Sequence, residues 1–245
     1  MFINEIDKIG VIITNDNYSY TGYKNNYCNN KHITTKRDFG TLYLTITSKV
    51  VKQFNKLGYI SANNIQNYYE ETIKNSSYSF SFETLLNSPL YWLDVKKDVC
   101  NTTGFSNQEV ISVLREKSYL STTKNETPSF AKDRGYEDSL LIKSTTKSSN
   151  DSMVIYCKIK EIRQNKWNDS DYYANFSEDW LLENENILRF ERRLQKSEDI
   201  KKAFKLNHLK KVTLLDVFDS DVDVVKEYVK TNLMKGERYE KENRN

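Results

Sequence analysis

Alternating apolar and polar residues predict several β-strands along the chain. The pattern is regular in TLYLTIT (41–47), in SPLYWLDVKKDV (88–99) and in NILRFERRL (186–194), and GVIIT (10–14) is typical of a first strand. LLIKSTT and MVIYCKIKEI, which the loop KSSND joins, predict two further strands of a hairpin or meander. These strands form the framework on which the other predictions are placed.

The run VIYCKIKEI (154–162) puts a tyrosine and two lysines into an otherwise apolar strand. Because side chains alternate along an extended chain, Ile155 and Ile159 fall on one face. Tyr156, Lys158 and Lys160 fall on the other face. One face is therefore expected to join the core, and the other is left for solvent or for chemistry.

Apolar residues spaced three and four apart predict helices between the strands. One helix is expected at 50–57, where Val50, Val51, Phe54 and Leu57 precede the stop signal Gly58. Further helices are predicted over 63–74, over 107–118 after a capping box of Ser106 and Glu109, over 198–206, from Thr213 with Asp216, and over 220–234. The Asn- and Tyr-rich stretch 15–32 has neither period and is interpreted as a solvated loop, with ligand contact by its tyrosines as the alternative.

The order of these elements predicts the fold class. Two rounds of strand, helix and strand favour an α+β fold with a largely antiparallel sheet and helices packed on one face. We predict a single domain over 1–234, followed by a flexible polar tail at 235–245.

Composition excludes several classes of protein. The formal net charge is +3, from 37 basic and 34 acidic residues, which permits a nucleic-acid partner without arguing for one. The 3 cysteines have no CxxC spacing, so neither a disulfide framework nor a zinc site is indicated and a reducing cytoplasm fits. No apolar run approaches the roughly 20 residues that cross a bilayer, and the N-terminus lacks a signal-peptide pattern, so no membrane association is expected.

Three predicted strands each carry a polar side chain suited to chemistry. Asp94, Tyr156 with Lys158, and Glu191 would together present two carboxylates, a phenol and an ammonium group if the strands are neighbours. Two hard oxygen ligands suit Mg²⁺ or Mn²⁺, which polarises a phosphoryl oxygen. A tyrosine is a weak nucleophile until a cation or a base favours its phenolate. The pattern therefore predicts metal-assisted attack on a phosphate.

Arginines near Glu191 are suited to hold backbone phosphates, because a guanidinium binds phosphate through two hydrogen bonds. They are Arg189, Arg192 and Arg193. Purely structural roles remain open for each candidate: RFERR suits an exposed, salt-bridged strand, and Asp94 can pair with Lys96 or Lys97. His32 and His208 are far apart, so a paired-histidine metal motif is absent from the sequence.

Four motifs, in order, resemble a known family. LYWLDVKKDV, GYEDSLLIKSTTKSSNDSMVIYCKIKEI, NILRFERRLQKSEDIKKAF and KKVTLLDVFD are similar to motifs of phage and plasmid replication initiators of the filamentous-phage gene II and replication initiation factor type. The likeness runs over residues 40–220. The chain departs from the family pattern at Cys157, where Asp or Asn is common, and at Trp92, where Arg is usual.

The resemblance implies a DNA nickase and religase that starts rolling-circle replication in the cytoplasm of a bacterial host. It assigns Tyr156 as the nucleophile and Lys158 as its phosphate-neutralising neighbour. It assigns the metal, Mg²⁺ or Mn²⁺, to Asp94, Glu191 and Glu161, although alternation puts Glu161 opposite Tyr156 unless the strand ends or bulges there. The residues expected to contact DNA are Lys96, Lys160, Arg189, Arg192 and Arg193.

The implied partner is single-stranded or hairpin origin DNA, with a host helicase as a further candidate and a monomer or homodimer as the active form. Two alternatives stay open: a relative of the same fold that binds DNA without cutting it, and a relaxase of a mobile element with the same chemistry. Tyr172 and Tyr173 are candidates for a second tyrosine in strand transfer.

Overall fold

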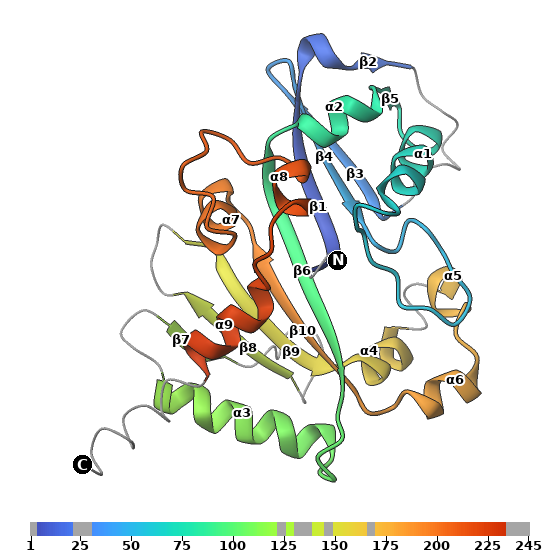
Figure 1. The fold of residues 1–245 in the computed structure, drawn as a ribbon. Coiled ribbons are helices and arrows are strands. Elements are labelled where there is room, and N and C mark those ends of the chain that lie inside the picture. The colour runs from blue at the N-terminus through green and yellow to red at the C-terminus, as the bar shows by residue number, and fades with distance from the viewer. Residues whose placement is uncertain are drawn as a thin grey trace. The chain divides into compact units, whose positions relative to one another are not determined.

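The computed structural model describes residues 4–21, 31–121, 126–129, 139–144, 149–165 and 170–233, and Figure 1 draws its fold. The chain divides into two compact units. Unit 1 comprises Met1–Gln53, Leu57–Val95 and Leu194–Val222, and unit 2 comprises Phe54–Lys56, Lys96–Arg193 and Asp223–Asn245. Since strands β6 (Leu90–Cys100) and β10 (Ile187–Leu194) contribute residues to both units, the prediction of one domain stays a prediction, and the tail at 235–245 lies outside the described residues.

Unit 1 places strands in the order β3-β4-β1-β6. Its elements, with the first part of β6, are β1 (Glu5–Thr14), η1 (Asn15–Asn17), β2 (Ser19–Tyr20), β3 (Ile33–Asp38), β4 (Thr41–Thr47), α1 (Ile65–Asn75), β5 (Tyr78–Ser79), α2 (Phe82–Asn87), α7 (Ser197–Ala203) and α8 (Leu214–Phe218). β4 pairs antiparallel with both β1 and β3, and the short strands β2 and β5 form a separate antiparallel ribbon.

The core of unit 1 follows from the alternation in its strands. Leu42, Leu44 and Ile46 of β4 are fully buried at 0% exposure, while the residues between them are half-buried. The register pairs Val11 of β1 with Leu44 and Ile9 with Ile46, so both strands turn the same apolar face to the core. The predicted strands at 10–14 and 41–47 are confirmed.

Unit 2 places strands in the order β6-β10-β9-β8-β7. Its elements, with the second part of β6 and most of β10, are α3 (Asn107–Ser121), β7 (Glu126–Ser129), β8 (Ser139–Ser144), β9 (Asp151–Cys157), α4 (Lys158–Asn165), α5 (Ser170–Tyr173), α6 (Glu178–Glu183) and α9 (Val224–Asn232). β8 and β9 pair antiparallel, which confirms the predicted hairpin. The predicted class, an α+β fold with a largely antiparallel sheet and helices on one side, is confirmed.

The helix predicted at 50–57 is wrong. The chain between β4 and α1 has no helix, and Phe54, assigned to the apolar stripe, is 69% exposed. Asn55 adopts a left-handed φ of 52°, which interrupts any helix there. Its side chain instead accepts a hydrogen bond from the Ser177 backbone N–H at 2.9 Å and donates one to the Ser177 hydroxyl at 3.1 Å. Two β-branched valines at the start of the segment also disfavour a helix.

The strand predicted over 153–162 ends sooner than expected. β9 stops at Cys157, and Lys158 is the first residue of helix α4. The apolar residues Ile159 and Ile162 are both buried in the helix, and their spacing of three residues is typical of a helix. The alternation of the run was interpreted as a strand instead. The expectation that Lys158 and Lys160 continue the strand face of Tyr156 is therefore wrong, because a helix sets their directions.

The stretch 15–32, predicted to be a loop, contains η1 and the two-residue strand β2 within its described part. Residues 22–30 lie outside the described residues. The capping boxes are confirmed: Ser106 and Glu109 exchange bonds at the start of α3, and Thr213 and Asp216 do so at the start of α8.

Replacement of Thr213 tests the cap of α8. The Thr213 hydroxyl accepts the backbone N–H of Asp216 at 3.4 Å and donates to the Asp216 carboxylate at 2.7 Å. We expect Thr213→Ala to lower the free energy of unfolding by about 0.5–2 kcal/mol, measured by urea denaturation. Thr213→Ser keeps the hydroxyl and should stay close to wild type; equal losses in both variants would refute a capping role.

Candidate active site

Tyr156 and Glu191 meet on neighbouring strands of unit 2. Tyr156 is the penultimate residue of β9, Glu191 lies in the middle of β10, and these two strands are adjacent in the sheet. The Tyr156 hydroxyl donates a hydrogen bond to Oε2 of Glu191 at 3.0 Å, and the two residues are 9% and 5% exposed. Oε1 of the same carboxylate accepts from Nε of Arg193 at 2.6 Å. One carboxylate therefore joins a phenol to a guanidinium.

A second buried carboxylate lies one turn into helix α4. Glu161 accepts a hydrogen bond from Nζ of Lys158 at 2.6 Å, and both side chains are under 10% exposed. Its other oxygen accepts from the Tyr173 hydroxyl at 2.8 Å. The pair forms because the chain turns helical at Lys158, which brings residues three apart onto one side.

The third ion pair joins β6 to β10. Nε and one terminal nitrogen of Arg189 donate to the two carboxylate oxygens of Asp98, each at 2.6 Å. Burial raises the pKa of Asp98, but the charge and hydrogen bonds of Arg189, together with the charges of Lys96 and Lys158, outweigh burial and hold the pKa below its usual 3.8. The carboxylate is therefore ionised at neutral pH.

Cations lie among the acids of β6, β10 and the β9–α4 junction. Lys158, Arg189 and Arg193 are each paired with one carboxylate, those of Glu161, Asp98 and Glu191 respectively, and Lys96 adds its positive charge near Asp98. Opposite charges attract strongly where little water reaches, so each pair holds its side chains in place.

The predicted metal ligands do not assemble within unit 2. Glu161 and Glu191 are each bound by a cation, and Asp94 belongs to unit 1, where its Oδ1 accepts the indole N–H of Trp92 at 2.8 Å. Across the described parts of the chain, no three His, Cys, Asp or Glu side chains gather as a metal-binding group. Binding of Mg²⁺ or Mn²⁺ by these acids stays a prediction.

The residues predicted to contact DNA differ in their surroundings. Arg192 donates to both oxygens of Asp151 at 3.0 and 2.7 Å and to the backbone oxygen of Val224 at 2.8 Å, so it fixes the start of α9. Lys96 is 2% exposed. Lys160 is exposed and, with Arg163, lines a cavity of about 430 Å³ beside Cys157. Contact with DNA stays a prediction for all five residues named from the sequence.

The sequence did not single out Asp98, and it named Tyr173 only as a candidate for strand transfer. Asp98 follows Asp94 and Lys96 at strand spacing, so alternation along β6 could have identified it. Tyr173 had no such signal as a partner for Glu161, because its contact depends on how α5 packs against α4. Tyr173 and Tyr172 are 2% and 4% exposed.

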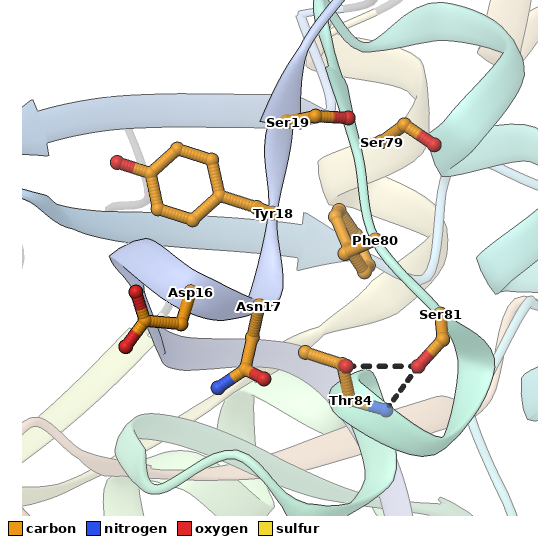
Figure 2. A pocket seen from close by; sticks show the side chains of 8 residues that line it. All are labelled: Asp16, Asn17, Tyr18, Ser19, Ser79, Phe80, Ser81 and Thr84. Carbon is orange, nitrogen blue, oxygen red and sulfur yellow. Dashed lines mark hydrogen bonds between the residues drawn. The ribbon is translucent and has the colours of Figure 1, made fainter.

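One tyrosine of the predicted loop, Tyr18, lines a depression in unit 1. The cavity has a volume of about 610 Å³ and is also lined by Phe80, Ser81 and Thr84. Figure 2 shows these side chains, with the hydroxyl groups of Ser81 and Thr84 hydrogen-bonded to each other. Tyr18 and Tyr20 each pack edge-on against Tyr78, with ring centroids 5.6 and 5.5 Å apart. These rings stabilise the β2–β5 ribbon, and ligand contact by them stays a prediction.

No protein-family model matches the chain, and a search of curated proteins finds no match. In the described part of the chain, no helix is long and apolar enough to cross a membrane.

The Asp98–Arg189 pair should make folding stability depend on acid pH. Because the pKa of Asp98 is lower in the folded than in the unfolded protein, its stabilisation is complete above the unfolded pKa and is lost as pH falls through the folded pKa. At neutral pH, we expect Asp98→Asn to destabilise the protein by about 3–5 kcal/mol, since it leaves Arg189 buried without its counter-ion. Between the folded and unfolded pKa values, the deficit should shrink as wild type is protonated.

Asp223→Asn is the matched control for this experiment. Asp223 pairs with Lys97 at 2.7 Å, but the Lys97 side chain is 47% exposed, and Asn also caps a helix well. Urea unfolding at several pH values should show a change of about 1 kcal/mol or less. An Asp98→Asn loss as small as the control's would contradict the proposed strength of the buried pair.

Proposed function

We propose that the protein is a rolling-circle replication initiator that nicks and rejoins single-stranded DNA through Tyr156. The observation that carries the proposal is the hydrogen bond from the Tyr156 hydroxyl to Glu191, whose carboxylate also accepts from Arg193. The resemblance of four ordered motifs to phage and plasmid initiators supports it. The proposal extends to an origin hairpin or melted origin as substrate and to the cytoplasm of a bacterial host.

The contact between Tyr156 and Glu191 suits general-base activation of the phenol. The Glu191 carboxylate would take the phenolic proton as the Tyr156 oxygen attacks the phosphorus atom. The new bond joins that oxygen to phosphorus, and the bond from phosphorus to the 3′ oxygen breaks. The products are a 5′-phosphotyrosine and a DNA strand whose 3′ oxygen takes up a proton to become a hydroxyl.

The cations beside Tyr156 suit the charge that develops during this step. A phosphodiester gains negative charge on its oxygens in the transition state, and ammonium and guanidinium groups stabilise it. The candidates are Arg193, which is paired with Glu191, and Lys158, which follows Tyr156 by two residues in the chain. Attack by the 3′-hydroxyl of the displaced strand on the phosphotyrosine would reverse the reaction and close a circle.

Burial of Tyr156 favours a second candidate, a relative of the same fold that binds DNA without cutting it. A phenol that is only 9% exposed must become accessible before a strand can reach it. The cations of these ion pairs also suit DNA binding alone. Both candidates share a DNA ligand and differ in whether a covalent adduct forms.

An adduct assay separates the two candidates. The protein is incubated with labelled single-stranded oligonucleotides spanning the candidate origin of its own element, with Mn²⁺ or with EDTA, and resolved on a denaturing gel. We expect wild type to carry the label and Tyr156→Phe to carry none. Glu191→Gln, which keeps the shape but loses the base, should form the adduct about 100-fold more slowly or worse.

Tyr172→Phe provides the control, because it removes the hydroxyl of a buried tyrosine outside the Tyr156–Glu191 contact. This variant should label like wild type. Strong DNA binding without adduct in wild type would select the non-cutting relative instead. An adduct that survives in Tyr156→Phe would refute the assigned nucleophile, and the EDTA arm shows whether a metal is needed.

A further inference from the structure

The sheet of unit 1 has one face that its own core does not use. Along β4, Leu42, Leu44 and Ile46 turn to the core, so Tyr43 and Thr45 point to the opposite face and are half-buried. The residues that pair with them follow the same rule, since Tyr43 lies opposite Ile12 of β1 and Lys36 of β3. This second surface, called the ring face below, is rich in aromatic residues.

A fixed row of rings crosses the ring face from β4 to β6. Tyr43 and Tyr91 make an edge-to-face contact with centroids 5.5 Å apart, and the Tyr91 hydroxyl shares a hydrogen bond with the Thr45 hydroxyl at 2.8 Å. Beside them, Nζ of Lys8 lies 3.8 Å from the centre of the Trp92 ring. Held in this way, the rings lose little further freedom when a ligand binds.

Gly10 makes this arrangement possible. A Cβ atom at Gly10 would lie 2.7 Å from Cβ of Trp92 and 3.0 Å from the ring of Tyr91, closer than real contacts allow. The absence of a side chain therefore lets Tyr91 lie across β1 and reach Thr45 on β4. The central strand thus leaves room for rings supplied by both of its neighbours.

Charged side chains of both signs border the ring face. On the neighbouring edge strand, exposed Lys36 pairs with Tyr43 and so lies on the ring face, as does Asp38 two residues later, whereas Arg37 pairs with Leu42 and lies on the opposite face. On the face itself, Lys8 covers Trp92, while the carboxylate of Asp94 is bonded to the Trp92 indole. Half-buried rings with the cations Lys8 and Lys36 beside them match a chain that alternates flat bases with phosphates.

We propose that the ring face of unit 1 binds single-stranded DNA by base stacking. The choice of DNA over RNA rests on the proposed function, whereas the stacking itself does not. Bases stack on Tyr43 and its neighbouring rings, and Lys36 neutralises a flanking phosphate. Stacking is tolerant of sequence because every base has a flat face.

Fluorescence anisotropy with labelled oligo(dT), in EDTA so that no cutting interferes, tests the proposal. We expect Tyr43→Ala to weaken binding about fivefold or more, while Tyr43→Phe, which keeps the ring, binds like wild type. Lys36→Gln should make the plot of log affinity against log salt shallower by about 0.7, the share of one phosphate.

Tyr59→Ala is the matched control, since Tyr59 is 41% exposed in unit 1 and lies outside β1, β3, β4 and β6. It should bind oligo(dT) like wild type. Equal affinity of wild type and folded Tyr43→Ala, or equal losses in Tyr43→Ala and Tyr59→Ala, would overturn the site. Tighter binding of oligo(rU) than of oligo(dT) would overturn the choice of DNA.

The two proposals fail separately in these experiments. If wild type forms no adduct but Tyr43→Ala still weakens oligo(dT) binding, the nickase proposal fails and the ring-face proposal is supported. If an adduct forms at Tyr156 but Tyr43→Ala does not change the affinity for oligo(dT), the nickase proposal is supported and the ring-face proposal is refuted.

Discussion

Buried ion pairs constrain unit 2 more than any other interaction. Arg189 with Asp98, Arg193 with Glu191 and Lys158 with Glu161 each place a cation and an acid together at 2.6 Å where little solvent reaches. Removal of one partner leaves a buried charge without compensation, so each pair fixes the position of the other side chain. Tyr156 is held by this constraint, because its hydroxyl binds the same carboxylate as Arg193.

These ion pairs both assemble the groups of a reactive centre and limit access to it. A phenol bonded to a carboxylate beside cations has the groups that tyrosine-dependent phosphoryl transfer needs. The same bonds bury the phenol, so a strand must displace contacts to reach it. In unit 1, by contrast, Gly10 allows rings to lie half-exposed on a sheet face, where unpaired bases can stack without rearrangement.

The sequence predicted most strands because alternation reports burial directly, as in β4 with its three fully buried apolar residues. It also predicted both capping boxes, which depend on residues three apart. It failed at 50–57, where apolar spacing suggested a helix but the bonds of Asn55 to Ser177, distant in the chain, favour another conformation. The sequence also failed to predict that the strand ends before Lys158. The residues that follow fit both patterns, because Ile159 and Ile162 have helical spacing while the run as a whole alternates like a strand.

For the site, the sequence identified Tyr156 and Glu191 but not their contact as a bonded pair. Glu191 was expected to bind a metal, whereas it accepts hydrogen bonds from Tyr156 and Arg193. Which of several acids faces a given tyrosine depends on strand order, and no local pattern encodes the adjacency of β9 and β10. The role of Arg192 depends on α9 in the same way.

Mass spectrometry of the protein–DNA adduct is the most direct test of the assigned nucleophile. After proteolysis and nuclease treatment, we predict that the residual nucleotide is attached to the peptide that contains Tyr156 and to its phenolic oxygen. A nucleotide on any other residue, Tyr172 or Tyr173 included, would contradict the central claim.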